Sequence, residues 1–320
     1  ILARDSVKIF EQLSDELEYD IELNQRGYLI LAYIEKEVEQ FQKNVQLERS
    51  LGIPTRLITP DEAREIVPVL NTKEVLAATY CPTDGNVNPL LTTFAYAEAA
   101  QRLGVKLYQF TEVQKIETNK HNIEGVVTNK GRILTDTVIN SAGGYAREIG
   151  ELAGVEIPVY AQRHQIMVTE PIDPLWAPML MSFSRNFYFQ QLPHGSIVGG
   201  YGDPENEIIG HNKGSSWQFA VTMAGKMIDL IPVLANVRIV RQWSGSYTMS
   251  PDSQPILGEH PQLKGFYMSV GFSGHGFMLA PITGVMLAEY ILEGETPLPI
   301  EKLHITRFER GELILEPSVV

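Results

Sequence analysis

The sequence predicts a mixed α/β (α+β) fold in which the chain passes between two domains more than once. The chain has 320 residues, which is enough for two domains of about 100–200 residues each. Helical and strand patterns alternate towards both ends, whereas residues 158–250 show mostly strand patterns interrupted by one helix. Hydrophobic residues make up 44% and charged residues 20% of the chain, as is usual for a globular protein.

Charge and cysteine content narrow the possible partners. The net charge is −13, which disfavours binding to nucleic acids or anionic membrane surfaces. The single cysteine, Cys81, allows no internal disulfide and indicates a reducing compartment, the cytoplasm. No apolar run approaches the roughly 20 residues that span a bilayer, so we expect no transmembrane segment. The seven histidines lack metal-ligand spacing, so we expect no metal site.

The first hundred residues predict helices separated by short strands. Thr59, Pro60 and Glu62 form a helix start with a capping box, and Asn88-Pro89 forms another. The expected elements are helix Asp5–Leu17, strand Gly27–Tyr33, helix Glu37–Leu51, a short helix from Thr59 to before Pro68, strand Leu76–Tyr80 and helix Asn88–Leu103.

The rest of the chain predicts more strands than helices. Turn residues separate the strand patterns, and a glycine closes the last long helix. The expected strands are Val105–Phe110, Thr111–Glu117, Ile123–Thr128, Thr137–Ser141, Gln165–Thr169, Phe187–Gln191, Ser196–Tyr201, Arg238–Trp243 and Phe266–Val270. The expected helices are Ala146–Leu152, Ser215–Ile231 and Phe277–Leu292.

Two strand–glycine–helix units are candidates for a binding site. They are TVINSAGGYA (Thr137–Ala146) and FYMSVGFSGHGFM (Phe266–Met278). Glycine lets the backbone approach a ligand closely, and a helix N-terminus offers free N–H groups and partial positive charge. Turns of this kind are also common as purely structural connections, and neither unit is a GxGxxG fingerprint or a P-loop.

Side chains near the second unit could line a pocket. His275 lies between two glycines, so few neighbouring side chains cover it. On a strand, Arg241, Trp243 and Gly245 share one face. The alternative is that Trp243 belongs to the core and that Arg241 forms a structural ion pair.

Several longer motifs carry a resemblance to a known family. GFSGHGFMLAP (Gly271–Pro281), preceded by RQWSGSYTMSPDSQPILG (Arg241–Gly258), resembles the C-terminal signature of the glycine oxidase, sarcosine oxidase and D-amino-acid oxidase group. LITPDEAREIVP (Leu57–Pro68) and RFERGEL (Arg307–Leu313) are similar to the β subunits of heterotetrameric dye-linked L-proline dehydrogenase and, more distantly, sarcosine oxidase. The resemblance covers essentially the whole chain.

This resemblance implies a Rossmann-like FAD-binding domain interleaved with an antiparallel substrate domain. It assigns residues 1–20, 86–155 and 252–320 to the FAD-binding domain, and residues 21–85 and 156–251 to the substrate-binding domain. The implied cofactor-binding residues are Val113, Ala142, Gly143, Gly144, Gly245, Gly271, Phe272, Ser273, Gly274, His275, Gly276, Phe277 and Met278. The candidate catalytic residues are His275, Tyr247, Tyr188 and Arg241.

Four departures from the family pattern shape the functional expectation. The first βαβ unit, with its GxGxxG turn, would lie upstream of Ile1, so we expect the chain to begin inside a larger fold. Met278 stands where sarcosine oxidases have a carboxylate-binding lysine. No lysine occurs near Ile197–Val198, where an oxygen-activating lysine would fall. Gln162 stands near the position of a histidine that attaches FMN covalently, so any FMN at a subunit interface would be non-covalent.

We therefore expect an FAD-dependent dehydrogenase that oxidises the C–N bond of a secondary amino acid or amine, such as L-proline or sarcosine. Its electrons would pass to an acceptor other than oxygen, such as a quinone, a dye or a partner subunit of a hetero-oligomer. Two alternatives remain open at this point. One is a glycine- or sarcosine-type oxidase that produces hydrogen peroxide. The other is a flavin-free fragment or structural subunit.

Overall fold

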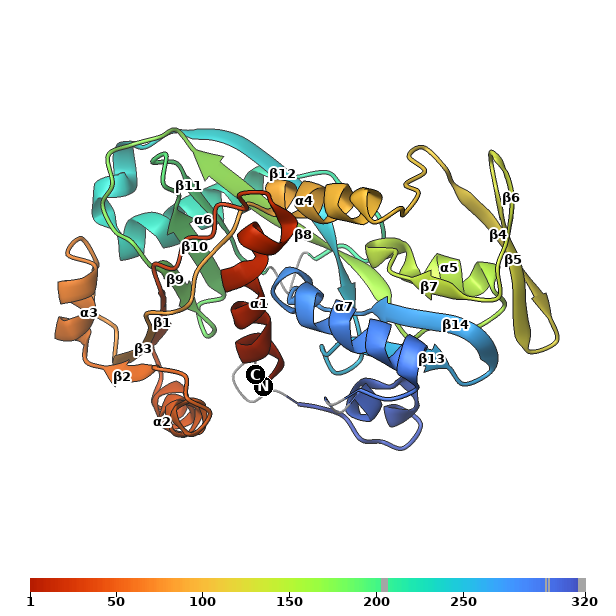
Figure 1. Ribbon diagram of the computed structural model, residues 1–320. Coiled ribbons are helices and arrows are strands. Elements are labelled where there is room, and N and C mark those ends of the chain that lie inside the picture. Colours follow the sequence, from red (N-terminus) through yellow and green to blue (C-terminus); the bar gives the residue numbers. More distant parts are fainter. Residues whose placement is uncertain (203–206, 297, 299, 316–320) are drawn as a thin grey trace.

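The computed structural model describes residues 1–202, 207–296, 298 and 300–315, and shows two β-sheets with helices packed around them (Figure 1). Residues 203–206, 297, 299 and 316–320, which fall in the expected domain ranges 156–251 and 252–320, lie outside the described residues. The described helices are α1 (Leu2–Leu17), α2 (Glu35–Ser50), α3 (Pro60–Ile66), α4 (Pro89–Arg102), α5 (Ala146–Leu152), α6 (Trp217–Leu230) and α7 (Gly276–Glu293). Short 3-10 turns are η1 (Gly143–Tyr145), η2 (Pro232–Asn236), η3 (Ile300–Leu303) and η4 (Ile305–Arg307).

The larger sheet is built mainly from the middle of the chain. Its strands are β1 (Tyr28–Ala32), β2 (Arg56–Ile58), β3 (Ala77–Cys81), β8 (Tyr160–Thr169), β9 (Met179–Ser182), β10 (Phe187–Gln191), β11 (Ile197–Gly200) and β12 (Ile239–Met249). Their order is β12-β8-β11-β10-β9-β1-β3-β2, and the pairing is antiparallel except between β1 and β9.

The two faces of this sheet differ in what covers them. One face packs against α6 and α3, and its side chains include Leu29, Met167 and Phe189, all 0–1% exposed. Side chains alternate along a strand, so their neighbours Ile30, Ile166 and Tyr188 point to the opposite face, which we call the open face. The cross-strand register places the open-face residues of successive strands beside one another.

The smaller sheet joins the C-terminal part of the chain to residues 113–140. Its strands are β4 (Val113–Asn119), β5 (Asn122–Thr128), β6 (Gly131–Leu134), β7 (Val138–Asn140), β13 (Ile256–His260) and β14 (Leu263–Val270). The order is β13-β14-β5-β4, with β6 beside β5 and β7 beside β14. Pairing of β7 with β14 is parallel, from Phe266 opposite Val138 to Met268 opposite Asn140. The hairpin of β4, β5 and β6 extends to one side of the molecule (Figure 1).

Local sequence signals explain where α3 and α4 begin. The Thr59–Glu62 capping box forms as expected at the start of α3, and the Asn88 side chain accepts hydrogen bonds from the backbone N–H groups of Leu90 and Leu91 in α4. The expected strand Val105–Phe110 is wrong, because this segment is exposed and has no strand partner among the described residues. A strand needs a neighbour to satisfy its backbone groups, so apolar composition alone does not produce one.

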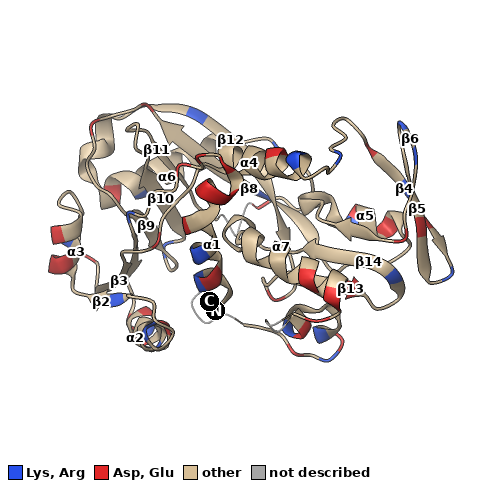
Figure 2. Ribbon diagram, in the orientation of Figure 1, with Lys and Arg blue, Asp and Glu red and all other residues tan. Residues whose placement is uncertain are grey.

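Helix α7 is longer and more apolar than the sequence analysis led us to expect of any segment. By length and composition alone, α7 could cross a membrane, although a third of it (33%) is buried within the chain. Core helices of soluble proteins meet the same criterion. Its first turn packs on α1, where Phe10 and Phe277 stack with ring centroids 5.8 Å apart and Ser6 donates a hydrogen bond to the carbonyl of Met278. Figure 2 shows charge on α7 only near its C-terminal end.

Candidate flavin and substrate site

The two glycine turns singled out from the sequence lie side by side. They follow β7 and β14, which are adjacent and parallel, so both turns leave the same edge of the smaller sheet. In open α/β sheets, ligands bind outside the carboxyl ends of the strands. The structure thus brings together the two segments that the sequence analysis proposed for cofactor binding.

The first turn is shaped by Asn140. Its side-chain amide donates to the carbonyl of Ala146, and its side-chain oxygen accepts from the backbone N–H of Ala142. Gly143 has φ +55°. A Cβ added to Gly144 would lie 2.9 Å from the Cβ of Ser246. The turn therefore packs directly against β12 of the larger sheet.

The second turn packs against the same strand. Gly271, Ser273 and Gly274 all have positive φ, at +73°, +49° and +99°. The backbone N–H of Ser273 donates to the carbonyl of Thr248. A Cβ added to Gly274 would lie 2.9 Å from the ring of Tyr247. The first turn thus meets β12 on the covered face at Ser246, and the second meets it on the open face at Tyr247, both near the end of the strand.

The N-terminus of α7 can receive an electron-rich group. The backbone N–H groups of Gly276, Phe277 and Met278 begin the helix and have no acceptor within it. Among the described residues, no hydrogen bond from these groups is found. A helix start also carries partial positive charge. These donors and the glycine backbone beside them fit the pyrimidine edge of a flavin, where negative charge develops on reduction.

The open face presents a cluster of three rings below the second turn. His164 of β8 stacks on Tyr247 of β12, with centroids 4.3 Å apart and an interplanar angle of 8°. The Nε2 atom of His164 lies 2.8 Å from the hydroxyl of Tyr188 on β10. A side-chain hydrogen bond also joins Tyr188 to Tyr247. Three strands therefore contribute to one cluster of polar rings on the open face.

The three rings are uncharged at physiological pH. Burial lowers the pKa of His164 to about 4. Burial also raises the pKa of Tyr188, and the neighbouring phenol adds to this effect. Burial raises the pKa of Tyr247, although its hydrogen bond with Tyr188 acts in the opposite direction. The cluster can therefore donate and accept hydrogen bonds, but His164 is too weak a base to hold a proton near pH 7.

The structure does not bring all candidate catalytic residues together. Tyr188 and Tyr247 are in direct contact. Arg241 lies on the same face but six residues along β12, about 20 Å away, where its guanidinium stands over the Trp243 ring, 5.7 Å from the centroid. His275 caps α7 beside Gly274, and its ring has no hydrogen bond among the described residues. Trp243 is 38% exposed and not in the core.

The remaining candidates occupy separate positions. Gly245 faces His164 across the strand pair, with open space where a side chain would lie. Val113 begins β4 opposite Thr128 in the hairpin sheet. The candidate catalytic residues omitted His164. Its place in the RHQIMV run shows that it shares a face with Ile166, but sequence could not show the phenols it meets.

His164 makes stability depend on pH. In the unfolded chain this imidazole takes up a proton below about pH 6.5, whereas in the folded chain it does so only near pH 4. The contribution of neutral His164 to the free energy of unfolding is complete above pH 6.5 and is lost as pH falls towards 4. We expect His164→Gln to reduce the pH slope of unfolding free energy in this window by up to about 1.4 kcal/mol per pH unit. Urea unfolding between pH 7 and 4.5 measures the slope for each variant. The control is His121→Gln, at an exposed position. Equal slopes for His164→Gln and His121→Gln would contradict the prediction.

Comparison with known proteins agrees with this geometry. The family model described as FAD dependent oxidoreductase matches residues 1–290. The sarcosine oxidase β subunit of Arthrobacter sp. is 29% identical over 317 residues, covering 97% of this chain and 77% of that protein. Human mitochondrial dimethylglycine dehydrogenase is 28% identical, and the match covers 95% of this chain but only 37% of that protein.

Solved structures give the same result. The crystal structure of L-proline dehydrogenase from P. horikoshii has a TM-score of 0.93 and 40% identity, covering 98% of this chain and 84% of that one. Glycine oxidase from Geobacillus kaustophilus has a TM-score of 0.87 and 26% identity, covering 96% and 82%. The chain therefore belongs to the family of FAD-dependent oxidoreductases, together with enzymes named for the oxidation or dehydrogenation of sarcosine, proline and glycine.

Proposed function

We propose that this protein oxidises the C–N bond of a secondary amino acid, L-proline or an N-methylglycine, and passes the electrons to an acceptor other than oxygen. The observation that carries the proposal is the His164–Tyr188–Tyr247 cluster directly below the Gly271–Gly276 turn. FAD, when bound, supplies the acceptor for the hydride that leaves the substrate carbon. The oxidised product is an imine, which water hydrolyses.

The proposed substrate site combines hydrogen-bonded phenol hydroxyls with apolar side chains. Tyr188 and Tyr247 keep their protons because burial raises the pKa of both phenols. Neutral hydroxyls can donate to a substrate carboxylate. Several open-face side chains near them are apolar, which suits a ring or an N-methyl group; by register they are Ile30, Met181, Ile166 and Val198. Gln162, opposite Tyr247, is polar. We propose that the larger sheet holds the substrate and that the smaller sheet holds FAD, following the domain ranges given above.

The surroundings also favour an uncharged amine. Hydride can leave the carbon beside nitrogen only when the nitrogen lone pair is free to form the imine. Neither the neutral His164 nor the two phenols can stabilise an ammonium ion by charge. Burial penalises that ion, so these three residues favour the neutral amine, whereas the Glu207 carboxylate, whose charge raises the pKa of Tyr247, favours the cation.

The choice of acceptor rests on the absence of a lysine from the open face. The eight strands of the larger sheet, all within the described residues, contain no lysine, and Val198 occupies the open face of β11. Met278, in the first turn of α7, is 44% exposed. A cation beside the flavin would favour electron transfer to oxygen through charge stabilisation, so these residues support a dehydrogenase over a peroxide-forming oxidase.

A partner subunit would receive the electrons. Two of the curated relatives are named as β subunits, which supports a hetero-oligomer. Gln162 on β8 contacts Glu207 and pairs with Ile209. Because this residue is a glutamine and not a histidine, we propose that any FMN at a subunit interface is bound without a covalent link. The single cysteine, which allows no internal disulfide, supports a reducing compartment such as the cytoplasm.

Anaerobic titration of the full-length protein with L-proline, sarcosine and glycine tests the proposal. We expect L-proline or sarcosine to bleach the flavin absorbance, and turnover to require a dye with little hydrogen peroxide formed in air. Fast oxygen-dependent peroxide formation would instead establish an oxidase. A purified full-length protein without bound flavin would support a structural role and refute the proposed catalysis.

Substitution of one phenol tests substrate binding separately. Removing a hydroxyl that donates to a carboxylate costs about 1.5–3 kcal/mol, so Tyr247→Phe should raise the substrate dissociation constant by roughly 10–100-fold. Anaerobic flavin titration measures this constant. Tyr160→Phe, at the exposed start of β8, is the matched control and should leave it unchanged. Equal constants for Tyr247→Phe and wild type would show that this hydroxyl does not touch the substrate.

A further inference from the structure

A fully buried arginine near the C-terminus is connected to the second glycine turn. Arg307, at the end of η4, has 0% side-chain exposure and forms a two-point ion pair with Asp252, at 2.8 Å from Nε and 2.9 Å from the second terminal nitrogen. It also donates to the carbonyls of Leu303 and Gln254. Buried ion pairs add little net stability compared with apolar packing. The question is therefore which segments this ion pair holds in place.

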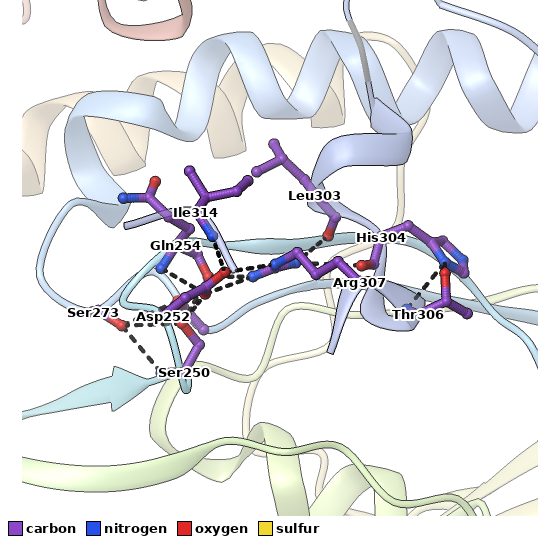
Figure 3. A network of polar contacts seen from close by, with 10 residues as sticks. Ser250, Asp252, Gln254, Ser273, Leu303, His304, Thr306, Arg307 and Ile314 are labelled. Carbon is purple, nitrogen blue, oxygen red and sulfur yellow. Dashed lines mark hydrogen bonds and ion pairs between the residues drawn. The ribbon is translucent and has the colours of Figure 1, made fainter. Parts of the chain in front are cut away.

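The Asp252 carboxylate accepts hydrogen bonds from three residues. Besides Arg307, these are the backbone N–H groups of Gln254 and Ile314, and the hydroxyl of Ser250 lies 3.4 Å away. Burial raises the pKa of Asp252, but the hydrogen bonds from Arg307 and the backbone outweigh this effect and leave the pKa below its usual value. The carboxylate is therefore ionised and held rigidly between β12 and the C-terminal segment (Figure 3).

Ser250 connects this buried network to the second glycine turn by hydrogen bonds. Its hydroxyl donates to the carbonyl of Gln254 at 2.7 Å, and its backbone N–H donates to the hydroxyl of Ser273 at 3.1 Å. Ser273 has φ +49°, a left-handed conformation that costs a side-chain-bearing residue about 1–2 kcal/mol. The contacts of Ser273 with Ser250 and Thr248 offset this cost. Figure 3 shows this path from Arg307 through Asp252 to Ser273.

We propose that Arg307 is a positioning residue that, through Asp252 and Ser250, fixes the left-handed Gly271–Gly276 turn and thereby sets how strongly the start of α7 stabilises a reduced flavin. This rests on the proposed flavin site. Arg307 touches neither the turn nor the N–H groups of α7. A turn released from Ser250 would relax towards other backbone conformations and misdirect these groups.

Sulfite binding to the flavin tests this arrangement without turnover. Sulfite adds to N5 of oxidised flavin and leaves negative charge at the pyrimidine edge, so its dissociation constant reports how well that charge is stabilised. Because Arg307→Met leaves a buried carboxylate unpaired and destabilises the fold, the test uses Arg307→Lys and Ser273→Ala in the full-length holoprotein. The exposed Arg310→Met is the matched control.

We expect Ser273→Ala to raise the sulfite dissociation constant at least tenfold, and Arg307→Lys to raise it by a smaller factor, because lysine keeps the charge but loses the two-point geometry. FAD affinity of the apoprotein should fall in the same order, and Arg310→Met should match wild type. Folded variants with unchanged sulfite and FAD constants would overturn the proposal. Failure of amino acids to reduce the wild-type flavin would refute the proposed function but leave these ratios valid.

Discussion

Gly274→Ala is expected to lower kcat/KM at least about 100-fold, because small displacements of reacting groups have effects of this size. Gly274 has φ +99°, and an added Cβ would lie 2.9 Å from one ring atom of Tyr247 and 3.2 Å from another. Tyr247 cannot yield freely, since its ring stacks on His164. Either the turn or the ring cluster must move. Steady-state kinetics with the best amino-acid substrate measures the loss.

Gly225→Ala in α6 is the control for this substitution. No heavy atom lies within 4 Å of its added Cβ, and alanine is favoured over glycine inside a helix by roughly 0.5–1 kcal/mol. This variant should keep wild-type kinetics and unfold at a slightly higher urea concentration. If Gly274→Ala kept kcat/KM within about threefold of wild type, the turn could not be packed on the substrate cluster as described.

Arg307→Met is expected to lower the free energy of unfolding by about 3–5 kcal/mol. The loss arises because the buried Asp252 carboxylate keeps its charge but loses its cationic partner. Asp252→Asn/Arg307→Met removes both charges, and the single amide oxygen can still accept from one of the two backbone N–H groups, Gln254 or Ile314, that bind separate carboxylate oxygens in wild type. The double variant should therefore recover part of the lost stability.

Urea unfolding of the single and double variants at pH 7 measures both values. Replacing only one partner of an exposed pair, as in Arg147→Met beside Glu151, should change stability by no more than about 1 kcal/mol. A double variant as unstable as Arg307→Met would show that packing volume, and not the unpaired carboxylate, causes the loss.

Sequence patterns were sufficient for the parts of the fold that depend on neighbouring residues. The expected helix Ala146–Leu152 and strand Phe187–Gln191 match α5 and β10 residue for residue. The capping box at Thr59 is equally local. The short strands β9 and β13 were missed.

The candidate site was harder to predict because cross-strand register is a tertiary property. The sequence identified both glycine turns, and the parallel pairing of β7 with β14 places them together. It could not show that His164 contacts Tyr188, which lies 24 residues away on β10. It also grouped Arg241 with Tyr247, although the extended β12 separates them.

The reactivity of Cys81 with a thiol reagent can be used to follow local opening of the larger sheet. Cys81 lies on β3 opposite Tyr28 and is 6% exposed, and burial raises the pKa of its thiol. Since the chain has one cysteine, the reaction of an added thiol reagent with the unmodified chain reports a single location. The thiol reacts only when the β1–β3 pair opens. Its labelling rate therefore follows the local opening of the larger sheet, and a ligand that binds across that sheet should slow it.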